Sequence, residues 1–435
     1  MTNNITKSEH RNERERERER GREGGRERER ERERERVNPR SDVFSFQNLL
    51  GAYYRCRKTK RKSSSAAKFE INFERELLKL EEELQRHTYE SGRSICFAIT
   101  DPKLREVWAA DFRDRVVHHL LVSRLEPIWE KMFIFHSYAC RREKGAHKAI
   151  CYLNKTISPS LFFLQADIQS FFVSINKDVL SSLVKKYIKN PEIVWLTEKI
   201  IFHDPTKNYF AKGDLKLLAS VPPHKSLFGK NDCGLPIGNL TSQFFANIYL
   251  NELDQFVKHS LKCRYYFRYM DDLLLLHSSK EQLLLWKDDI NNFVETRLKL
   301  KLHPKKQILQ PAINGINFCG YIIKPGYALI RRRTVKKLKN KLWQFNKKIL
   351  DSLSPNNTPR ACDMIFDDPF IIFANPEFLE NFRHIFSSIN SVYGFFKHAD
   401  CYNLQKSLFE KHFGILKIYL IPADENYGYF VWDED

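Results

Sequence analysis

Two adjacent carboxylates, Asp271 and Asp272, interrupt an otherwise apolar stretch of the chain. An aromatic-rich run (residues 265–269) precedes the pair, and an apolar run (residues 273–276) follows it. Two short runs of this kind around a tight turn are typical of a β-hairpin, so both acids are expected at a sheet edge. Carboxylates held this close repel each other, which favours a divalent cation beside them. A plain surface turn is the alternative, because aspartate is common in turns.

A third carboxylate, Asp167, follows the apolar run 161–164 and precedes a helical pattern that begins near Asn176. This context predicts that Asp167 lies at the C-terminal end of a strand. Three carboxylates from two neighbouring strands are hard oxygen ligands of the kind that Mg2+ prefers. Two such ions about 4 Å apart can activate an attacking hydroxyl and stabilise a leaving pyrophosphate. The chemistry that these residues predict is nucleotidyl transfer.

A glycine-containing loop, residues 234–243, lies between these acids in the sequence and leads into an amphipathic helical pattern. Gly238 is expected to let the backbone approach a bound base or sugar, and the helix N-terminus behind it favours a phosphate. Thr241 or Ser242 is the expected helix cap. An ordinary loop before a helix is the alternative.

Together these segments resemble the reverse transcriptases, in which an acid in this strand context and a Tyr-x-Asp-Asp hairpin form the active site of the palm. The resemblance assigns catalysis to Asp167, Asp271 and Asp272. It implies two Mg2+ ions as cofactors. The metal-binding set that it implies is Asp167, Ile168, Asp271 and Asp272.

One departure from the common family pattern narrows the resemblance. Most reverse transcriptases read Gln-Gly-x-x-x-Ser-Pro where residues 237–243 of this chain read Ile-Gly-Asn-Leu-Thr-Ser-Gln. This variant resembles the reverse transcriptases of diversity-generating retroelements, which copy a template RNA and misincorporate opposite its adenines. Ile237 in place of an amide removes a hydrogen-bonding group beside the nascent pair, so lower fidelity is expected. Further similar segments lie at residues 109–119, 137–147, 204–209, 305–306, 318–320 and 389–394.

The resemblance also implies contacts to the incoming nucleotide. Phe172 matches an aromatic steric gate that favours deoxynucleotides, and a core aromatic beside Phe171 is its alternative. Lys103 with Arg105 matches a basic pair that binds the triphosphate, and Lys305 matches a lysine that assists the leaving pyrophosphate. Ordinary surface charge is the alternative for these three. The complete nucleotide-binding set is Lys103, Arg105, Phe172, Ile237, Gly238, Gln243 and Lys305.

Basic residues are expected to bind the template and primer. The chain has a formal net charge of +19, to which the Arg/Glu tract of residues 11–36 contributes only +2. A surplus of this size on the remaining chain favours a nucleic-acid partner, and phosphate contacts of this kind weaken as salt rises. Surface charge without a ligand is again the alternative. The expected template and primer contacts are Arg141, Arg142, Lys144, Arg331, Arg332 and Arg333.

The expected fold is α+β: a right-hand polymerase with fingers, a palm made of an antiparallel sheet with helices on one face, and a small helical thumb. Its expected parts are a low-complexity tail (1–42), an N-terminal helix with the fingers (43–160), the palm (161–323) with an insertion at 204–232, and the thumb (324–435). Apolar spacing predicts one helix over residues 68–87. The Pro, Asn and Asp content of residues 351–373 predicts a linker within the thumb.

Composition is compatible with this interpretation. The 42% hydrophobic and 13% aromatic content predicts a packed globular protein. Nine dispersed cysteines without paired metal-ligand spacing suit a reducing compartment and the protein core. No apolar run is long enough to span a bilayer, and no secretory segment is visible, so a cytoplasmic protein without membrane contact is expected.

Three functions remain open at this point. The first is a mutagenic RNA-templated DNA polymerase of a diversity-generating retroelement, with template RNA, cDNA and deoxynucleoside triphosphates as partners and a small basic accessory protein implied by the resemblance. The second is an antiviral or abortive-infection reverse transcriptase. The third is a non-catalytic RNA-binding scaffold, which three retained acids disfavour. The absence of a visible endonuclease module argues against a self-sufficient mobile intron protein.

Overall fold

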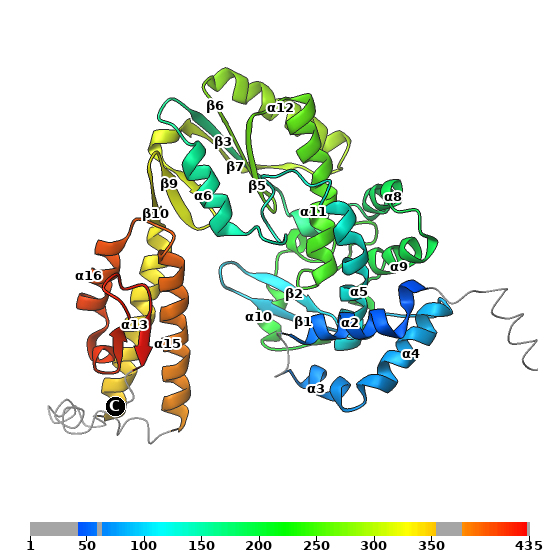
Figure 1. Cartoon of the computed structure of the whole chain (residues 1–435), viewed down its shortest axis with the longest axis horizontal. Coiled ribbons are helices and arrows are strands. Elements are labelled where there is room, and N and C mark those ends of the chain that lie inside the picture. The colour runs from blue at the N-terminus through cyan, green and yellow to red at the C-terminus, as the bar shows by residue number, and fades with distance from the viewer. Residues whose placement is uncertain (1–41, 59–62, 354–375, 433–435) are drawn as a thin grey trace, which may run out of the picture. The chain divides into compact units, whose positions relative to one another are not determined.

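The computed structural model describes residues 42–58, 63–353 and 376–432 (Figure 1). The chain divides into two compact units, each assembled from separate segments: residues 42–129 with 176–245, and residues 130–175 with 246–432. Both units combine helices with sheets, which confirms the mixed helix-and-sheet class with antiparallel pairing. The Arg/Glu tract lies outside the described residues, as does most of the expected 351–373 linker.

The first unit contains a three-stranded sheet of order β2-β1-β4. β1 (Ser94–Ile99) and β2 (Arg105–Ala109) form an antiparallel hairpin, and β4 (Tyr209–Ala211) pairs with β1 in parallel. The expected insertion at 204–232 therefore supplies a strand to this sheet and also contains α10 (Leu215–Ala219). The other longer helices of this unit are α2 (Phe46–Arg57), α3 (Ser64–Ile71), α4 (Phe73–Gln85), α5 (Phe112–Trp129), α8 (Lys177–Tyr187) and α9 (Pro191–Ile201).

The helix expected over residues 68–87 is divided in two, α3 and α4. Asn72 between them leaves the helical region, with φ −132° and ψ 37°. The apolar spacing continues across this break, so the pattern could not reveal it. The predicted apolar face is correct for α4, where Leu77, Leu80 and Leu84 are fully buried.

The second unit contains a four-stranded antiparallel sheet of order β5-β6-β3-β7. Its strands are β3 (Phe162–Ile168), β5 (Tyr265–Tyr269), β6 (Asp272–His277) and β7 (Leu302–Pro311). α12 (Lys280–Thr296) packs against β3, β6 and β7, and α6 (Ala146–Thr156) packs against β5. A three-stranded antiparallel sheet follows, built from β8 (Ile316–Phe318), β9 (Tyr321–Lys324) and β10 (Tyr327–Ile330).

The two units share α11 (Leu240–Gln255), which continues into a short π-helical segment, Phe256–Ser260. The prediction that Thr241 or Ser242 caps this helix is wrong, because the helix begins at Leu240. Both residues lie inside its first turn and are buried. The apolar pattern correctly predicted the helix, and its residues Phe245, Tyr249 and Leu253 are buried.

The C-terminal part of the second unit is mainly helical. α13 (Arg332–Leu353) and α15 (Pro376–Phe396) lie side by side, and α16 (Tyr402–His412) packs against α13 (Figure 1). A short hairpin of β11 (Leu420–Pro422) and β12 (Phe430–Trp432), which the sequence pattern did not predict, packs its buried Phe430 beside Tyr393 of α15. Within the described residues, no helix has the length and apolar character needed to cross a bilayer.

Candidate active site

The two strands at the centre of the four-stranded sheet bring two of the predicted catalytic acids opposite each other. Asp167, the next-to-last residue of β3, pairs in register with Asp272, the first residue of β6. Directly opposed residues of antiparallel strands project from the same face, with Cβ atoms about 5 Å apart. The pairing explains how acids that are distant in the sequence come to one sheet edge.

The third acid, Asp271, lies in the turn that joins β5 to β6. Tyr269 and Asp272 close this hairpin as a register pair, so Met270 and Asp271 alone form the turn. Met270 has a φ of 54°, in the left-handed region that a non-glycine residue rarely adopts. The turn is therefore a tightly specified piece of backbone beside the Asp167–Asp272 pair.

A lysine contacts the acid of the neighbouring strand. Nζ of Lys306 on β7 forms an ion pair with Oδ2 of Asp167. The sequence interpretation had named Lys305, whose side chain is exposed one residue earlier on the same strand. The regular β3–β7 register, continued by one pair, puts Lys306 opposite Asp167, but this register breaks between Ala166 and Ile168. Which residue of β7 lies opposite Asp167 depends on the alignment of β7 with β3, and the alternation of residues within one strand does not show it.

The charge of Asp272 also acts on Cys319, in the turn between β8 and β9, and on Arg331, directly after β10. The sequence interpretation did not connect these two residues with the acids. Burial, with the charge of Asp272 as a second cause, raises the pKa of the Cys319 thiol. Burial lowers the pKa of Arg331, and the Asp272 carboxylate partly offsets that effect. Arg331 is thus half-buried near an acid, whereas its neighbours Arg332 and Arg333 are exposed at the start of α13.

The predicted steric gate follows β3 directly. Phe171 is buried, and Phe172 beside it is partly exposed, with ring centroids 5.5 Å apart. The chain reverses just before them at Ser170, whose φ is 48°. Because its side chain is partly exposed, Phe172 is not a fully buried core residue.

The remaining predicted nucleotide-binding residues belong to the first unit. Lys103 and Arg105 are exposed at the β1–β2 hairpin. Ile237 and Gln243 are both partly exposed, before and within α11. Gly238 has a φ of 122°, and a Cβ there would lie 2.7 Å from the carbonyl oxygen of Trp108. Close packing on β2 is therefore a sufficient physical reason for this glycine.

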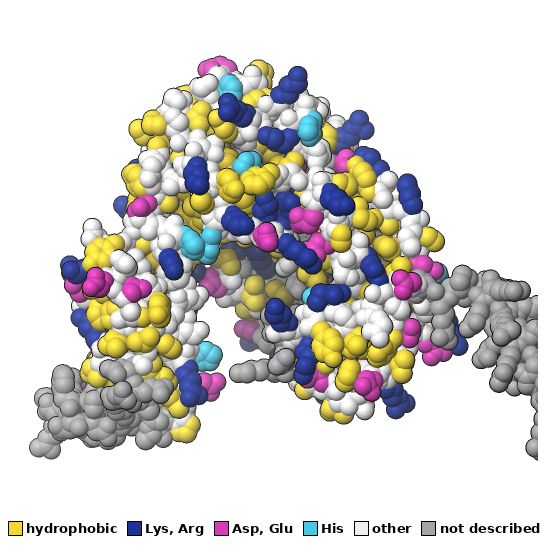
Figure 2. All heavy atoms as spheres, viewed as in Figure 1, with side chains coloured by type: hydrophobic (Ala, Val, Ile, Leu, Met, Phe, Trp, Pro, Cys, Tyr) yellow, Lys and Arg dark blue, Asp and Glu magenta, His cyan; other side chains and the backbone are white. Residues whose placement is uncertain are grey.

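The predicted template-binding residues before α6 differ in their surroundings. Arg141 donates to Glu130, at 2.8 Å from Nη2, and to the carbonyl oxygens of Ile134 and Ser137. Its side chain is only 4% exposed, so its guanidinium is buried and already hydrogen-bonded within the second unit. Lys144 donates to the carbonyl oxygen of Phe135, and Arg142 is exposed. Lys and Arg side chains are spread over the face drawn in Figure 2.

The donor set of the site is suitable for a hard divalent cation, since it consists of carboxylate oxygens. The ammonium group of Lys306 forms an ion pair with Asp167. The Asp167 carboxylate is therefore accessible to a positively charged group, as a metal ligand must be. Among the residues that the structure describes, no three His, Cys, Asp or Glu side chains are close enough together to hold an ion as they stand.

Residues 100–323, which include the acids and both of their strands, match the sequence profile of the family described as reverse transcriptase (RNA-dependent DNA polymerase). The match covers more than half of the chain, which therefore belongs to the reverse transcriptase family. Its enzyme class is that of an RNA-directed DNA polymerase. This confirms the prediction that the chain is a reverse transcriptase.

Individual relatives are distant. Protein YkfC of Escherichia coli (strain K12) is 25% identical over 302 residues, covering 60% of this chain and 72% of the relative. Group II intron-encoded protein LtrA of Lactococcus lactis subsp. cremoris is 22% identical over 284 residues, covering 51% of this chain and 45% of the relative. A putative COX1/OXI3 intron 2 protein of Saccharomyces cerevisiae is 20% identical, and the match covers 29% of its length. The chain thus spans less than half of these two intron proteins.

Proposed function

We propose that this chain polymerises DNA on an RNA template by two-metal nucleotidyl transfer, with Asp167, Asp271 and Asp272 as its catalytic acids. The register pair of Asp167 with Asp272, beside a turn that contains Asp271, is the observation that carries the proposal. The reverse transcriptase match over the same residues supports it. Deoxynucleoside triphosphates, template RNA and the cDNA product are the corresponding ligands.

Each acid has a part in the proposed chemistry. Asp167 and Asp271, with Ile168 beside the first, would hold two Mg2+ ions, and Asp272 would support them. Bound Mg2+ supplies activation of the primer hydroxyl and charge stabilisation for the leaving pyrophosphate. Lys306 forms an ion pair with Asp167. Lys305 is left as the lysine proposed to assist pyrophosphate release.

The fold offers proposed counterparts for the parts of a right-hand polymerase. The β1–β2 hairpin would act as fingers, with Lys103 and Arg105 on the triphosphate. The four-stranded sheet would act as the palm, with Phe172 as steric gate. The helices that follow residue 324 would act as the thumb, and exposed basic residues at the start of α13 would contact the primer-template.

Among reverse transcriptases, we propose an error-prone enzyme of a diversity-generating retroelement, acting with a small basic accessory protein. Ile237 and Gln243 support this choice because they replace the more common Gln and Pro of the family pattern. The relatives named above include a group II intron-encoded protein and a further intron protein, so the retroelement context rests on these two positions and the similar segments around them. A cytoplasmic location is part of the same proposal.

An antiviral reverse transcriptase and a non-catalytic RNA scaffold are the competing functions. Extension of a primed RNA template with deoxynucleotides and Mg2+, followed by sequencing of the products, separates all three. Errors concentrated opposite template adenine support the retroelement enzyme. Accurate or untemplated products support the antiviral enzyme, and no synthesis with the element's own RNA and accessory protein present supports the scaffold.

Ile237→Gln tests the proposed cause of low fidelity. We expect misincorporation opposite adenine to fall by roughly fivefold, because an amide restores a hydrogen-bonding group worth about 1 kcal/mol beside the nascent pair. Ile237→Val is the matched control, since it changes the side chain without adding a polar group, and its error frequency should stay native. Equal error frequencies for Ile237→Gln and the native chain would refute this role of Ile237.

A further inference from the structure

Arg268 on β5 lies one residue before the Tyr-Met-Asp-Asp segment, and its side chain is fully buried in the second unit. It faces Asp254 of α11, whose side chain is also fully buried. Nε donates to Asp254 Oδ1 at 2.8 Å, and Nη2 donates to Oδ2 at 2.7 Å. Burial works to lower the pKa of Arg268, but the Asp254 carboxylate outweighs it and the pKa is raised. The guanidinium therefore stays charged although it is buried.

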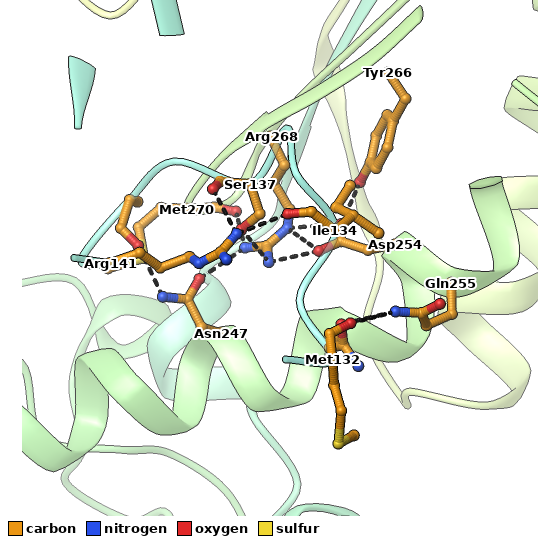
Figure 3. A network of polar contacts seen from close by, with 12 residues as sticks. Met132, Ile134, Ser137, Arg141, Asn247, Asp254, Gln255, Tyr266, Arg268 and Met270 are labelled. Atoms are coloured by element: carbon orange, nitrogen blue, oxygen red, sulfur yellow. Dashed lines mark hydrogen bonds and ion pairs between the residues drawn. The ribbon is translucent and has the colours of Figure 1, made fainter. Parts of the chain in front are cut away.

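The other N–H groups of this guanidinium are also used (Figure 3). Nη1 donates to Asn247 Oδ1 at 3.0 Å and to the carbonyl oxygen of Met270 at 3.2 Å, and Nη2 donates to Ser137 Oγ at 3.0 Å. A guanidinium has five N–H donors in a fixed planar fork, and here each has an acceptor. Lysine, with three donors on one nitrogen, cannot reproduce this set.

The main chain of Arg268 is held as firmly as its side chain. Its N–H donates to the carbonyl oxygen of His136 at 2.9 Å, and its own carbonyl accepts from the N–H of Tyr138 at 3.0 Å. β5 is thereby paired along its outer side with residues 136–138. The guanidinium thus projects from a fixed piece of backbone.

The bond to Met270 has a direct relation to the acids. The carbonyl of Met270 belongs to the peptide group that joins it to Asp271, so this hydrogen bond sets the plane of the peptide that carries the turn acid. Met270 is left-handed, which costs a non-glycine residue on the order of 1 kcal/mol and persists only when neighbours hold it. Among them is Nη1 of Arg268, whose side chain is fully buried and hydrogen-bonded at every nitrogen.

We propose that Arg268 is a positioning residue of the polymerase site, which uses the buried Asp254 as its anchor to fix the Met270–Asp271 peptide and so the direction of the Asp271 carboxylate. This inference rests on the proposed function. It assigns a role to a residue outside the catalytic acids, through the peptide bond that leads to one of them.

Arg268→Lys is the primary test, because it keeps the charge beside Asp254 but removes the planar fork. We expect kcat for primer extension to fall roughly 10- to 100-fold, the range seen when groups that orient metal ligands are removed. KM for the deoxynucleotide and affinity for the RNA should stay within twofold of native. The Mg2+ concentration for half-maximal rate should rise.

Tyr266→Phe is the matched control. The Tyr266 hydroxyl donates to the same Asp254 carboxylate at 2.8 Å, and the residue is fully buried. Its loss weakens the anchor without touching the Met270 bond. We expect a lower Tm, with native kcat and native Mg2+ dependence. A residue with a purely structural role would give the same pattern for Arg268→Lys.

A second variant protects the test against misfolding, because replacing Arg268 alone risks leaving a buried charge uncompensated. Arg268→Met/Asp254→Asn removes both charges of the pair together, so neither is left buried alone. The value of kcat should still be low, because methionine cannot donate to the Met270 carbonyl oxygen. Binding of Mn2+, followed by the EPR signal of the free ion, gives a readout that needs no synthesis. We expect weaker Mn2+ binding in both Arg268 variants and native binding in Tyr266→Phe.

The outcomes distinguish this inference from the proposed function. Native chain that binds Mn2+ but extends no primer counts against the polymerase, and the order of Mn2+ affinities still decides the role of Arg268. Arg268→Lys or the double variant with native kcat, native Mg2+ dependence and native Mn2+ affinity would overturn the inference.

Discussion

At the scale of single residues, the site is a set of charges whose partners lie on neighbouring strands. Asp167 is opposed in register by Asp272 and paired with Lys306. The places of the acids at a strand end and in a hairpin turn could be predicted, because two carboxylates between an aromatic and an apolar run are conspicuous. The choice of Lys306 over Lys305 could not, because it depends on how β7 is aligned with β3, and the sequence does not show this alignment. The anchor of Arg268 was also missed, since its partner Asp254 lies on another element.

The Lys306→Met substitution tests whether the ion pair between Lys306 and Asp167 competes with the binding of Mg2+. A lysine that neutralises Asp167 competes with Mg2+ for the same carboxylate, so its removal should lower the Mg2+ concentration for half-maximal extension. The side chain of Lys306 is 46% exposed, and such pairs are weak, so we expect a change of roughly two- to threefold. A Mg2+ titration of the initial extension rate measures it.

Lys305→Met is the comparison for this titration. The ion pair with Asp167 is made by Lys306, and the neighbouring Lys305 is exposed. The Lys305→Met variant should therefore reach its half-maximal rate at the native Mg2+ concentration, even if the rate itself changes. A Lys306→Met variant with an unchanged or increased Mg2+ requirement would contradict the competition between lysine and metal.

At the scale of elements, apolar periodicity predicted α11 and the strands that carry the acids, but not where helices break or begin. Asn72 divides α3 from α4 although the apolar spacing runs through it. β4 was also missed, because a three-residue strand that pairs with β1 in parallel leaves almost no periodic signal. Such features depend on long-range packing, which sequence patterns do not contain.

The loop before α11 offers a test at this scale. Gly238→Ala would place a Cβ 2.7 Å from the Trp108 carbonyl oxygen, at a φ that alanine rarely adopts. We expect the free energy of unfolding of the first unit to fall by about 2 to 4 kcal/mol. Urea unfolding followed by tryptophan fluorescence measures the change.

Gly394→Ala is the matched control for that substitution. Gly394 lies within α15, and a Cβ there would meet nothing within 4 Å. Alanine in a helix should leave stability unchanged or raise it by up to about 1 kcal/mol. Native stability of Gly238→Ala would mean that the loop is not held by its packing on β2.

At the scale of the whole molecule, the sequence indicated the family and the mixed fold, but not how the chain is distributed between its units. Residues 176–245 join the unit that contains residues 42–129, so the chain leaves that unit and returns to it. A linear division into fingers, palm and thumb stays a prediction. The formal charge of +19 is a property of the whole chain and favours a polyanionic partner.

The most direct test of the central claim is extension of a primed RNA template with deoxynucleotides and Mg2+ by the native chain and by Asp271→Ala/Asp272→Ala. We expect the double variant to bind the RNA as the native chain does and to lose at least about a thousandfold in rate, because its metal ligands are gone. Asp288→Asn/Asp289→Asn is the matched control, an exposed Asp-Asp pair on α12 that should leave the rate native. Extension by the Asp271→Ala/Asp272→Ala variant at the native rate would contradict the assignment of this hairpin as the polymerase site.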